Sequence, residues 1–99
     1  MSDMYDRFGK PIESNEWSRL RQIRDYKIVK QETLPNGVWV STVWLGLDHQ
    51  YEDGGVPLIF ETMVFPKDGT HEEVDMERYS TEEEAINGHL AIVKKWRSK

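Results

Sequence analysis

Six polar residues have side chains that could act together in a binding or catalytic site. They are Asp48, His49, Glu61, Arg78, Tyr79 and His89. A carboxylate and an imidazole can transfer protons, and an arginine beside a tyrosine can bind an anion. If the side chains converge in one pocket, the sequence predicts a small hydrolase or lyase that uses His49, Glu61 and His89.

The same residues also fit a structural role. Glu61 lies among apolar neighbours, where an ionised carboxylate is costly unless it is paired, and the fork of Arg78 could satisfy it. His89 falls on an apolar helical stripe, as a hydrogen-bonded core histidine does, and Asp48 could cap its own loop. Structural ion pairs commonly occupy such positions, so the structural interpretation is favoured while both stay open.

Metal and cofactor chemistry receives little support from the spacing of ligands. Asp48, His49, Glu61 and His89 are of types that bind zinc or a harder cation. However, the chain has no HxH, HxxxH or HExxH pattern and no cysteine, which excludes thiolate sites and disulfides. It also has no GxxxxGK[ST] or GxGxxG loop. We therefore expect no metal and no cofactor. A non-enzymatic role is favoured over an enzymatic one.

Charge narrows the classes of partner. The 99 residues carry a net charge of −5, and such a surface repels phosphate, so direct binding of nucleic acid is not expected. The acidic runs form either a solvated surface or a mimic of nucleic acid that occupies another protein's basic groove. No apolar run approaches the ~20 residues that cross a bilayer, and we expect a cytoplasmic protein without membrane contact. The acidic runs are Glu72, Glu73, Asp75 and Glu77, then Glu82, Glu83 and Glu84.

The expected fold class is α+β, with one domain over residues 1–99. Turn signals such as Asn36-Gly37 separate segments that alternate in hydropathy. A capping box of Ser80 and Glu83 begins a helix that runs to about Arg97, and its wide apolar stripe must pack on a sheet. The expectation is an antiparallel sheet of about four strands, this helix on one face, and a short N-terminal helix. The ranges are an extended arm at 1–12, the first helix at 15–24, and strands at 26–33, 38–47, 58–65 and 74–79.

Tryptophan is abundant for a thin core. Some of Trp17, Trp39, Trp44 and Trp96 should stay partly exposed on the sheet face opposite the C-terminal helix. Trp39 and Trp44 could then anchor a partner, because exposed tryptophans often do so. Alternatively, the N-terminal helix covers that face through Trp17.

Several stretches share a recognisable pattern: 41–49 (STVWLGLDH), 57–65 (PLIFETMVF), 78–81 (RYST), 83–85 (EEA) and 88–89 (GH). With this pattern the chain resembles, over about residues 3–97, a family of small proteins encoded by bacteriophages and prophages, notably of actinobacteria. The resemblance implies a phage origin and a cytoplasmic place in the infected host cell. It implies no particular activity.

These observations together predict a non-enzymatic phage accessory protein that binds a host protein or a small signalling molecule, with counter-defence as one role of this kind. The free edges of the sheet also allow a homo-oligomer. The alternatives are the small hydrolase or lyase, with or without a metal, and the acidic mimic of nucleic acid.

Overall fold

The computed structural model describes residues 3–48, 56–69 and 72–99, and it confirms the α+β fold with a four-stranded antiparallel sheet. None of the described helices is both long and apolar enough to span a membrane. The elements are α1 (Ser14–Arg21), α2 (Arg24–Lys27), β1 (Ile28–Thr33), β2 (Trp39–Trp44), β3 (Phe60–Phe65), β4 (Asp75–Tyr79) and α3 (Glu82–Arg97).

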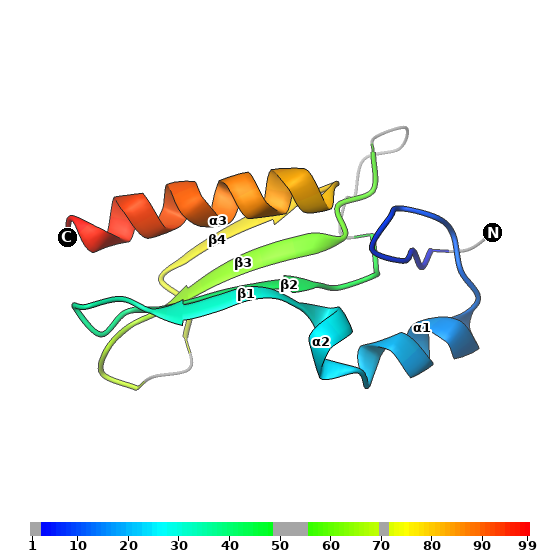
Figure 1. Ribbon diagram of the computed structural model, residues 1–99, viewed down its shortest axis with the longest axis horizontal. Coiled ribbons are helices and arrows are strands. Elements are labelled where there is room, and N and C mark those ends of the chain that lie inside the picture. The colour runs from blue at the N-terminus through cyan, green and yellow to red at the C-terminus, as the bar shows by residue number, and fades with distance from the viewer. Residues whose placement is uncertain (1–2, 49–55, 70–71) are drawn as a thin grey trace.

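The strands form a simple meander in the order β1-β2-β3-β4, and α3 lies across one face of the sheet (Figure 1). All neighbouring strands are antiparallel. The turn between β1 and β2 uses the predicted signal, since Gly37 has a φ of +89° and its N–H donates to Leu34 O at 2.8 Å. The Asn36 side chain also donates to Trp96 O at 2.8 Å and so ties this turn to the end of α3.

The helix α3 begins one residue later than predicted. Thr81, and not Ser80, is the N-cap, and its capping box is completed by Glu84 instead of Glu83. Both pairs have the required spacing of three, so the pattern alone could not choose between them. The acidic first turn and the basic last turn of α3 suit the helix dipole.

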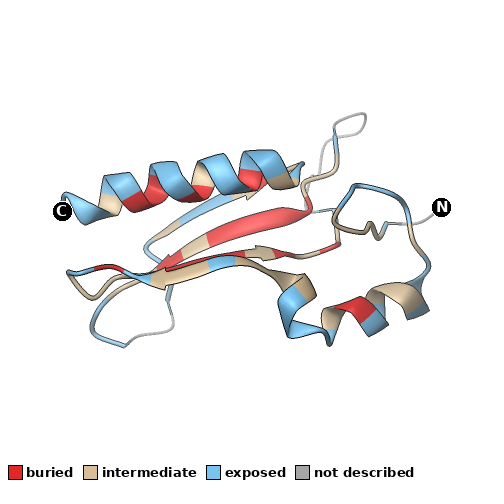
Figure 2. Cartoon of the chain, viewed as in Figure 1, coloured by how far each residue is buried: buried red, intermediate tan, exposed pale blue. Residues whose placement is uncertain are grey.

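The core lies between α3 and the sheet, where α3 buries one stripe of side chains (Figure 2). Alternation along the strands places alternate residues of β2 and β3 on the face toward α3, and all of them are fully buried. Two apolar clusters result, one around Trp44 and Phe60 and one around Val40 and Val64. The helix-facing residues are Val40, Thr42 and Trp44 in β2 and Phe60, Thr62 and Val64 in β3.

The N-terminal part differs from the expected arm and helix. Residues 3–12 fold back as a loop, in which Asp6 Oδ1 accepts from the N–H groups of Phe8 and Lys10, both at 2.9 Å. A bridge of Tyr5 with Pro11 closes this loop, and a bridge of Met4 with Leu47 joins it to the segment after β2, so it is not a simple extended arm. Helix α1 ends at Arg21, and the segment expected to begin the first strand instead forms α2 before β1.

Candidate functional site

The six candidate residues do not form one site. Glu61 pairs across the sheet with Val43 and Arg78 and points away from α3. His89 lies on α3, between the helix and the other face of the sheet. The sheet therefore separates Glu61 from His89, and these two side chains do not meet in one pocket, as the predicted hydrolase or lyase would require. The third member of that set, His49, lies outside the described residues.

Glu61 and Arg78 form the cross-strand pair that the structural interpretation anticipated. Arg78 Nε donates to Glu61 Oε2 at 3.0 Å, and the Glu61 side chain is only 8% exposed. Asp48 likewise has a structural contact, since its Oδ1 accepts from Leu58 N at 3.2 Å and closes its own loop. The described residues contain no group of three side chains suited to hold a metal ion.

His89 belongs to a buried chain of polar groups that crosses from the edge strand β1 to β4. Its Nε2 lies 2.8 Å from Glu32 Oε2, and its Nδ1 lies 2.6 Å from Thr42 Oγ1. Thr42 Oγ1 is 2.5 Å from Thr62 Oγ1, which accepts from the Tyr79 hydroxyl at 3.1 Å. The chain therefore runs through five side chains between the two apolar clusters.

The hydrogen-bond directions along this chain are mutually consistent. A carboxylate only accepts, so Nε2 of His89 donates to Glu32. Tyr79 donates to Thr62 at the other end, and Thr62 can then donate to Thr42 and Thr42 to Nδ1 of His89. Each buried hydroxyl thus uses its hydrogen, which is the condition for placing polar groups in a core at little cost.

The end groups of this hydrogen-bonded series, Glu32 and Tyr79, have shifted pKa values. The hydrogen bond from His89 is the main cause that lowers the pKa of Glu32, and Lys30 and Arg97 add to it. Burial is the main cause that raises the pKa of Tyr79. The arrangement of carboxylate, imidazole and hydroxyl resembles that of a catalytic triad in residue types, but His89 and Thr42 have no exposed surface. A substrate cannot reach the Thr42 hydroxyl, so the chain has a structural role.

No helix or strand among the described residues lies over the middle of the opposite face of the sheet. Helices α1 and α2 lie beyond one end of the sheet (Figure 1), and Trp17 packs there against Gly46, with its Nε1 donating to Leu45 O at 3.0 Å. Trp17 therefore lies at this end of the sheet and not over the middle of its face. We call this surface the open face. It consists of Ile28, Gln31, Thr33, Trp39, Ser41, Val43, Glu61, Met63, Phe65, Met76 and Arg78.

Apolar side chains dominate one half of the open face. Trp39 stacks on Phe65 with ring centroids 5.3 Å apart, and Met63 lies opposite Met76 on the neighbouring strand. Trp39 is 37% exposed and Met76 is 39% exposed. Trp44, by contrast, is fully buried, which corrects the expectation that it could anchor a partner. Its alternation places it toward α3, where Tyr26 packs edge-on against its ring.

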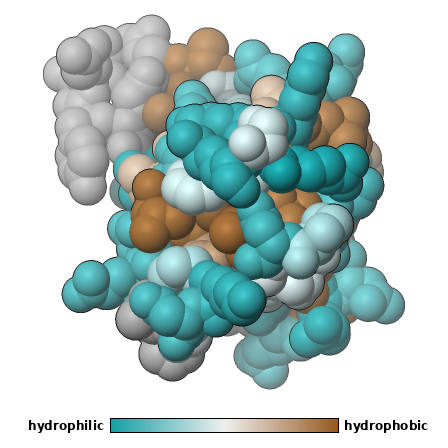
Figure 3. Space-filling model, turned by 90° about the vertical axis from the view of Figure 1, so that its left-hand side faces the viewer, coloured by the Kyte–Doolittle hydropathy of each residue, from teal (hydrophilic) through white to brown (hydrophobic). Residues whose placement is uncertain are grey.

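Polar groups of the open face are satisfied by neighbours on the face itself. Gln31 Nε2 donates to Ser41 Oγ at 2.8 Å, and Arg78 donates to Glu61. Where α1 and α2 meet β1 and β2, a groove of about 310 Å³ is lined by Arg21, Arg24 and Lys27. The open face is therefore apolar at one end and cationic at the other. At the end of the molecule that carries the C-terminus, hydrophobic side chains reach the surface in patches between hydrophilic ones (Figure 3).

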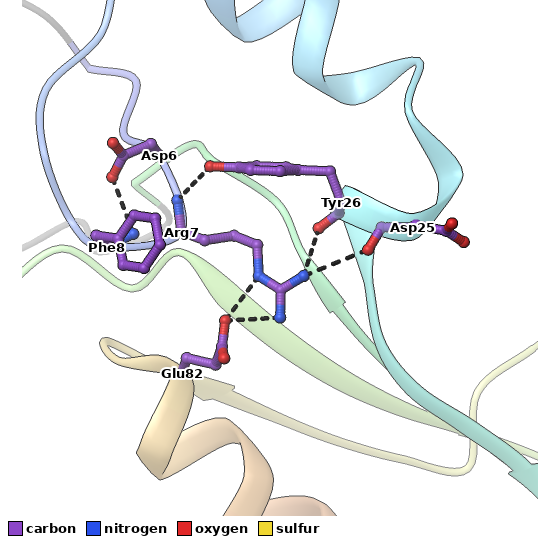
Figure 4. A network of polar contacts seen from close by, with 6 residues as sticks. All are labelled: Asp6, Arg7, Phe8, Asp25, Tyr26 and Glu82. Carbon is purple, nitrogen blue, oxygen red and sulfur yellow. Dashed lines mark hydrogen bonds and ion pairs between the residues drawn. The ribbon is translucent and has the colours of Figure 1, made fainter.

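Arg7 is a structurally important residue that the sequence did not single out. Its guanidinium donates to Glu82 Oε1 at 2.7 Å and to Tyr26 O at 2.9 Å, and its backbone N–H donates to the Tyr26 hydroxyl (Figure 4). A weaker contact reaches Asp25 O at 3.4 Å. Arg7 thus joins the N-terminal loop, α2 and the first turn of α3.

The other residues that sequence analysis missed are the partners of His89. Thr42 and Thr62 alternate with apolar residues on the helix-facing side of their strands, so their hydroxyls had to find partners in the core. That signal could have been read. Glu32 and Arg7 gave no comparable signal, because each lies in a polar segment that reads as surface.

Comparisons of the chain with protein-family models, with curated proteins and with solved structures give no match.

Proposed function

We propose that the protein is a non-enzymatic binding module, a phage accessory protein that uses the open face to bind a protein of the infected cell. The observation that carries the proposal is the uncovered half-sheet around the stacked Trp39 and Phe65. An aromatic pair beside Met63 and Met76 offers large apolar side chains, and such side chains often provide much of the binding energy when a partner buries them. The phage origin and cytoplasmic location rest on the sequence resemblance.

The internal use of the candidate polar residues supports a binding role over a catalytic one. Glu61, Arg78, Tyr79 and His89 each satisfy another side chain of the protein itself. A surface that is apolar at one end and cationic at the other favours a protein partner with an apolar patch beside carboxylates. Host defence proteins are one class of target that such a module could block.

Comparison of matched variants tests this proposal. Purified protein with a C-terminal tag is added to lysate of an actinobacterial phage host, and bound proteins are identified by mass spectrometry. Trp39→Ser with Met76→Ser removes two exposed apolar groups of the open face, whereas Phe8→Ser removes an exposed ring elsewhere, since Phe8 is 86% exposed. We expect a partner that binds the native protein and Phe8→Ser and loses at least about tenfold in affinity for the open-face variant.

The result that would overturn the proposal is a partner retained equally by all three proteins, or no partner at all. Circular dichroism of the double variant must first match the native spectrum. Because both replaced side chains are more than half buried and Trp39 stacks on Phe65, we expect the double variant to lose about 1–3 kcal/mol in unfolding free energy and to remain folded.

A second candidate, a small signalling molecule as ligand, is favoured by one pocket. It has a volume of about 350 Å³ and lies between the N-terminal loop and the start of α3, with Tyr5, Ile59 and Pro57 in its apolar wall and Arg7 at its rim. This volume is in the range of small-molecule sites. Native mass spectrometry of the protein recovered from infected cells tests this candidate. A bound molecule smaller than a peptide would support the ligand, and a mass equal to that of the protein alone would oppose it.

The acidic mimic of nucleic acid is less favoured. Glu82 is bonded to Arg7, Glu84 completes the cap of α3, and Asp75 accepts hydrogen bonds from Lys95 and Trp96. These carboxylates act within the protein, which interrupts the acidic runs that a charged ridge would need.

A further inference from the structure

No strand of the described residues neighbours the outer side of the edge strand β1. This strand pairs only with β2 in the described sheet. Its outward backbone N–H and C=O groups are therefore available for hydrogen bonds with an added strand. A register shift between Ile28 and Lys30 interrupts the pairing near the start of β1, so the regular part runs from Lys30 to Thr33.

A groove runs along this edge, between β1 and α3. Its volume is about 480 Å³, and Leu90 and Val93 form its apolar part. Leu90 is 51% exposed, and Ile86, four residues earlier on the same side of α3, is 44% exposed. The groove thus offers a flank of aliphatic side chains that runs beside the unpaired edge.

Cations border this groove although the protein as a whole is acidic. Lys30, Lys94 and Arg97 line it, whereas the net charge of the chain is −5. The carboxylate in the lining, Glu32, is already held by His89 and lies 3.8 Å from Lys30 Nζ. The opposite edge strand, β4, has the acidic residues Asp75 and Glu77. Positive charge is therefore concentrated beside β1.

We infer that β1 binds an extended acidic segment of another polypeptide, which adds to the sheet as a fifth strand. Its backbone would pair with the outer side of β1. Every second side chain of the added strand would lie on the α3 side of the sheet. There its carboxylates would face Lys30, Lys94 and Arg97 and their methylene groups would contact Leu90, while the apolar side chains between them would lie on the other side of the sheet. This inference is independent of the proposed function, because it concerns a different surface and different residues.

Charge complementarity favours an acidic strand over a β1–β1 pair with a second copy and over a nucleic acid. A second copy that pairs β1 with β1 would bring Lys30 near its own counterpart, and lysine on an edge strand is a known guard against such pairing. A single-stranded nucleic acid would find cations but no ring on which to stack, since no aromatic side chain lines the groove. An acidic strand uses the cations, the apolar flank and the free backbone together.

The test uses the full-length protein and a fluorescent peptide of about eight residues that alternates glutamate and valine. Binding is followed by fluorescence anisotropy, and the site is located by NMR shifts of backbone amides. We expect the largest shifts in Lys30–Thr33 and around Leu90, and binding that weakens as salt rises from about 0.05 M to about 0.5 M. A peptide that alternates lysine and valine should not bind.

Charge reversal supplies the matched variants. Lys30→Glu with Lys94→Glu should weaken binding of the acidic peptide at least about tenfold, because two attractions become repulsions. Lys10→Glu, an exposed cation in the N-terminal loop, is the control and should leave the affinity within about twofold. The open-face variant Trp39→Ser should also bind the peptide normally, which separates this inference from the proposed function.

Four results would overturn the inference. One is the absence of peptide binding at low salt. Another is a loss of affinity with Lys10→Glu equal to that with Lys30→Glu and Lys94→Glu, which would indicate general charge attraction and no specific site. A third is tighter binding of oligouridylate than of the peptide through the same lysines, which indicates a nucleic-acid surface. The fourth is a dimer of the native protein in sedimentation that Lys30→Glu abolishes. Such a dimer would show that β1 binds a second copy of the protein, for example through its acidic strand β4.

Discussion

The phenol ring of Tyr79 in β4 lies directly against the backbone of Gly88 in α3. A Cβ built on Gly88 would be 2.1 Å from Cε1 of Tyr79 and 2.4 Å from its hydroxyl oxygen. The absence of a side chain at Gly88 therefore lets α3 approach β4 closely enough for the ring to fit. That position in turn brings the Tyr79 hydroxyl within 3.1 Å of Thr62 Oγ1.

Gly88→Ala should destabilise the protein. Alanine favours a helix over glycine by about 1 kcal/mol, but the added methyl group would overlap a ring that is packed and only 8% exposed. We expect a net loss of about 1–3 kcal/mol in the free energy of unfolding, measured with urea. Asn87→Ala, one residue earlier and exposed, is the control and should be neutral or slightly stabilising. Equal stability of Gly88→Ala and the native protein would contradict this packing.

Thr42→Val should be costly although it changes the shape little. The variant leaves Nδ1 of His89 and the hydroxyl of Thr62 without the partner that both now share. An unsatisfied buried polar group costs about 1–3 kcal/mol. The same replacement at the exposed Thr33 should change the free energy of unfolding by less than about 0.5 kcal/mol. Similar values for the two variants would show that the buried chain contributes nothing to stability.

The sequence was sufficient to predict most of the fold. Alternation in 38–47 and 58–65, the Asn36-Gly37 turn and the stripe of α3 reflect burial, which acts residue by residue and leaves a pattern in the chain. Element ends were less certain. Ser80 and Thr81 both match a capping box, and residues 26 and 27, where alternation suggested the start of a strand, belong to the helical turn α2.

The candidate site was predicted only in part. The pair of Glu61 and Arg78 could be anticipated, because a carboxylate in an apolar strand requires a partner and a neighbouring strand offered an arginine. The role of Glu32 depends on how β1 and α3 meet, and no local pattern encodes that contact. Trp39 and Trp44 are a similar case. Alternation places them on opposite faces of β2, but the sequence does not indicate which of the two faces α3 covers.

Glu32 should make stability depend on pH. Its pKa is lowered in the folded state, chiefly by the hydrogen bond from His89. A lowered folded pKa means that the ionised form stabilises the fold above the ordinary value of 4.5, and that this contribution is lost as pH falls through the lower folded pKa. The native protein should therefore exceed Glu32→Gln in unfolding free energy at neutral pH, and the difference should shrink below pH 4.5. Urea unfolding of both proteins at several pH values measures it, and a constant difference would contradict the assignment.

Arg7 should contribute more to stability than an ordinary surface arginine. Its side chain is 18% exposed and bonds to Glu82 and to the carbonyl of Tyr26, so Arg7→Ala would leave a carbonyl and a carboxylate without their donor. We expect a loss of about 1–3 kcal/mol in the free energy of unfolding. The matched control is Arg19→Ala, which removes an exposed pair with Glu16 three residues away on α1 and should cost less than about 0.5 kcal/mol.

Arg7→Lys provides the sharper comparison, because it keeps the charge but cannot reach Glu82 and the Tyr26 carbonyl with one planar group. Its stability should lie between those of the native protein and Arg7→Ala. Hydrogen exchange should locate the loss in residues 24–27 and in the first turn of α3, the two segments that Arg7 holds together. Exchange that increases evenly over the whole chain, or an Arg19→Ala variant as unstable as Arg7→Ala, would show that Arg7 does not join these elements.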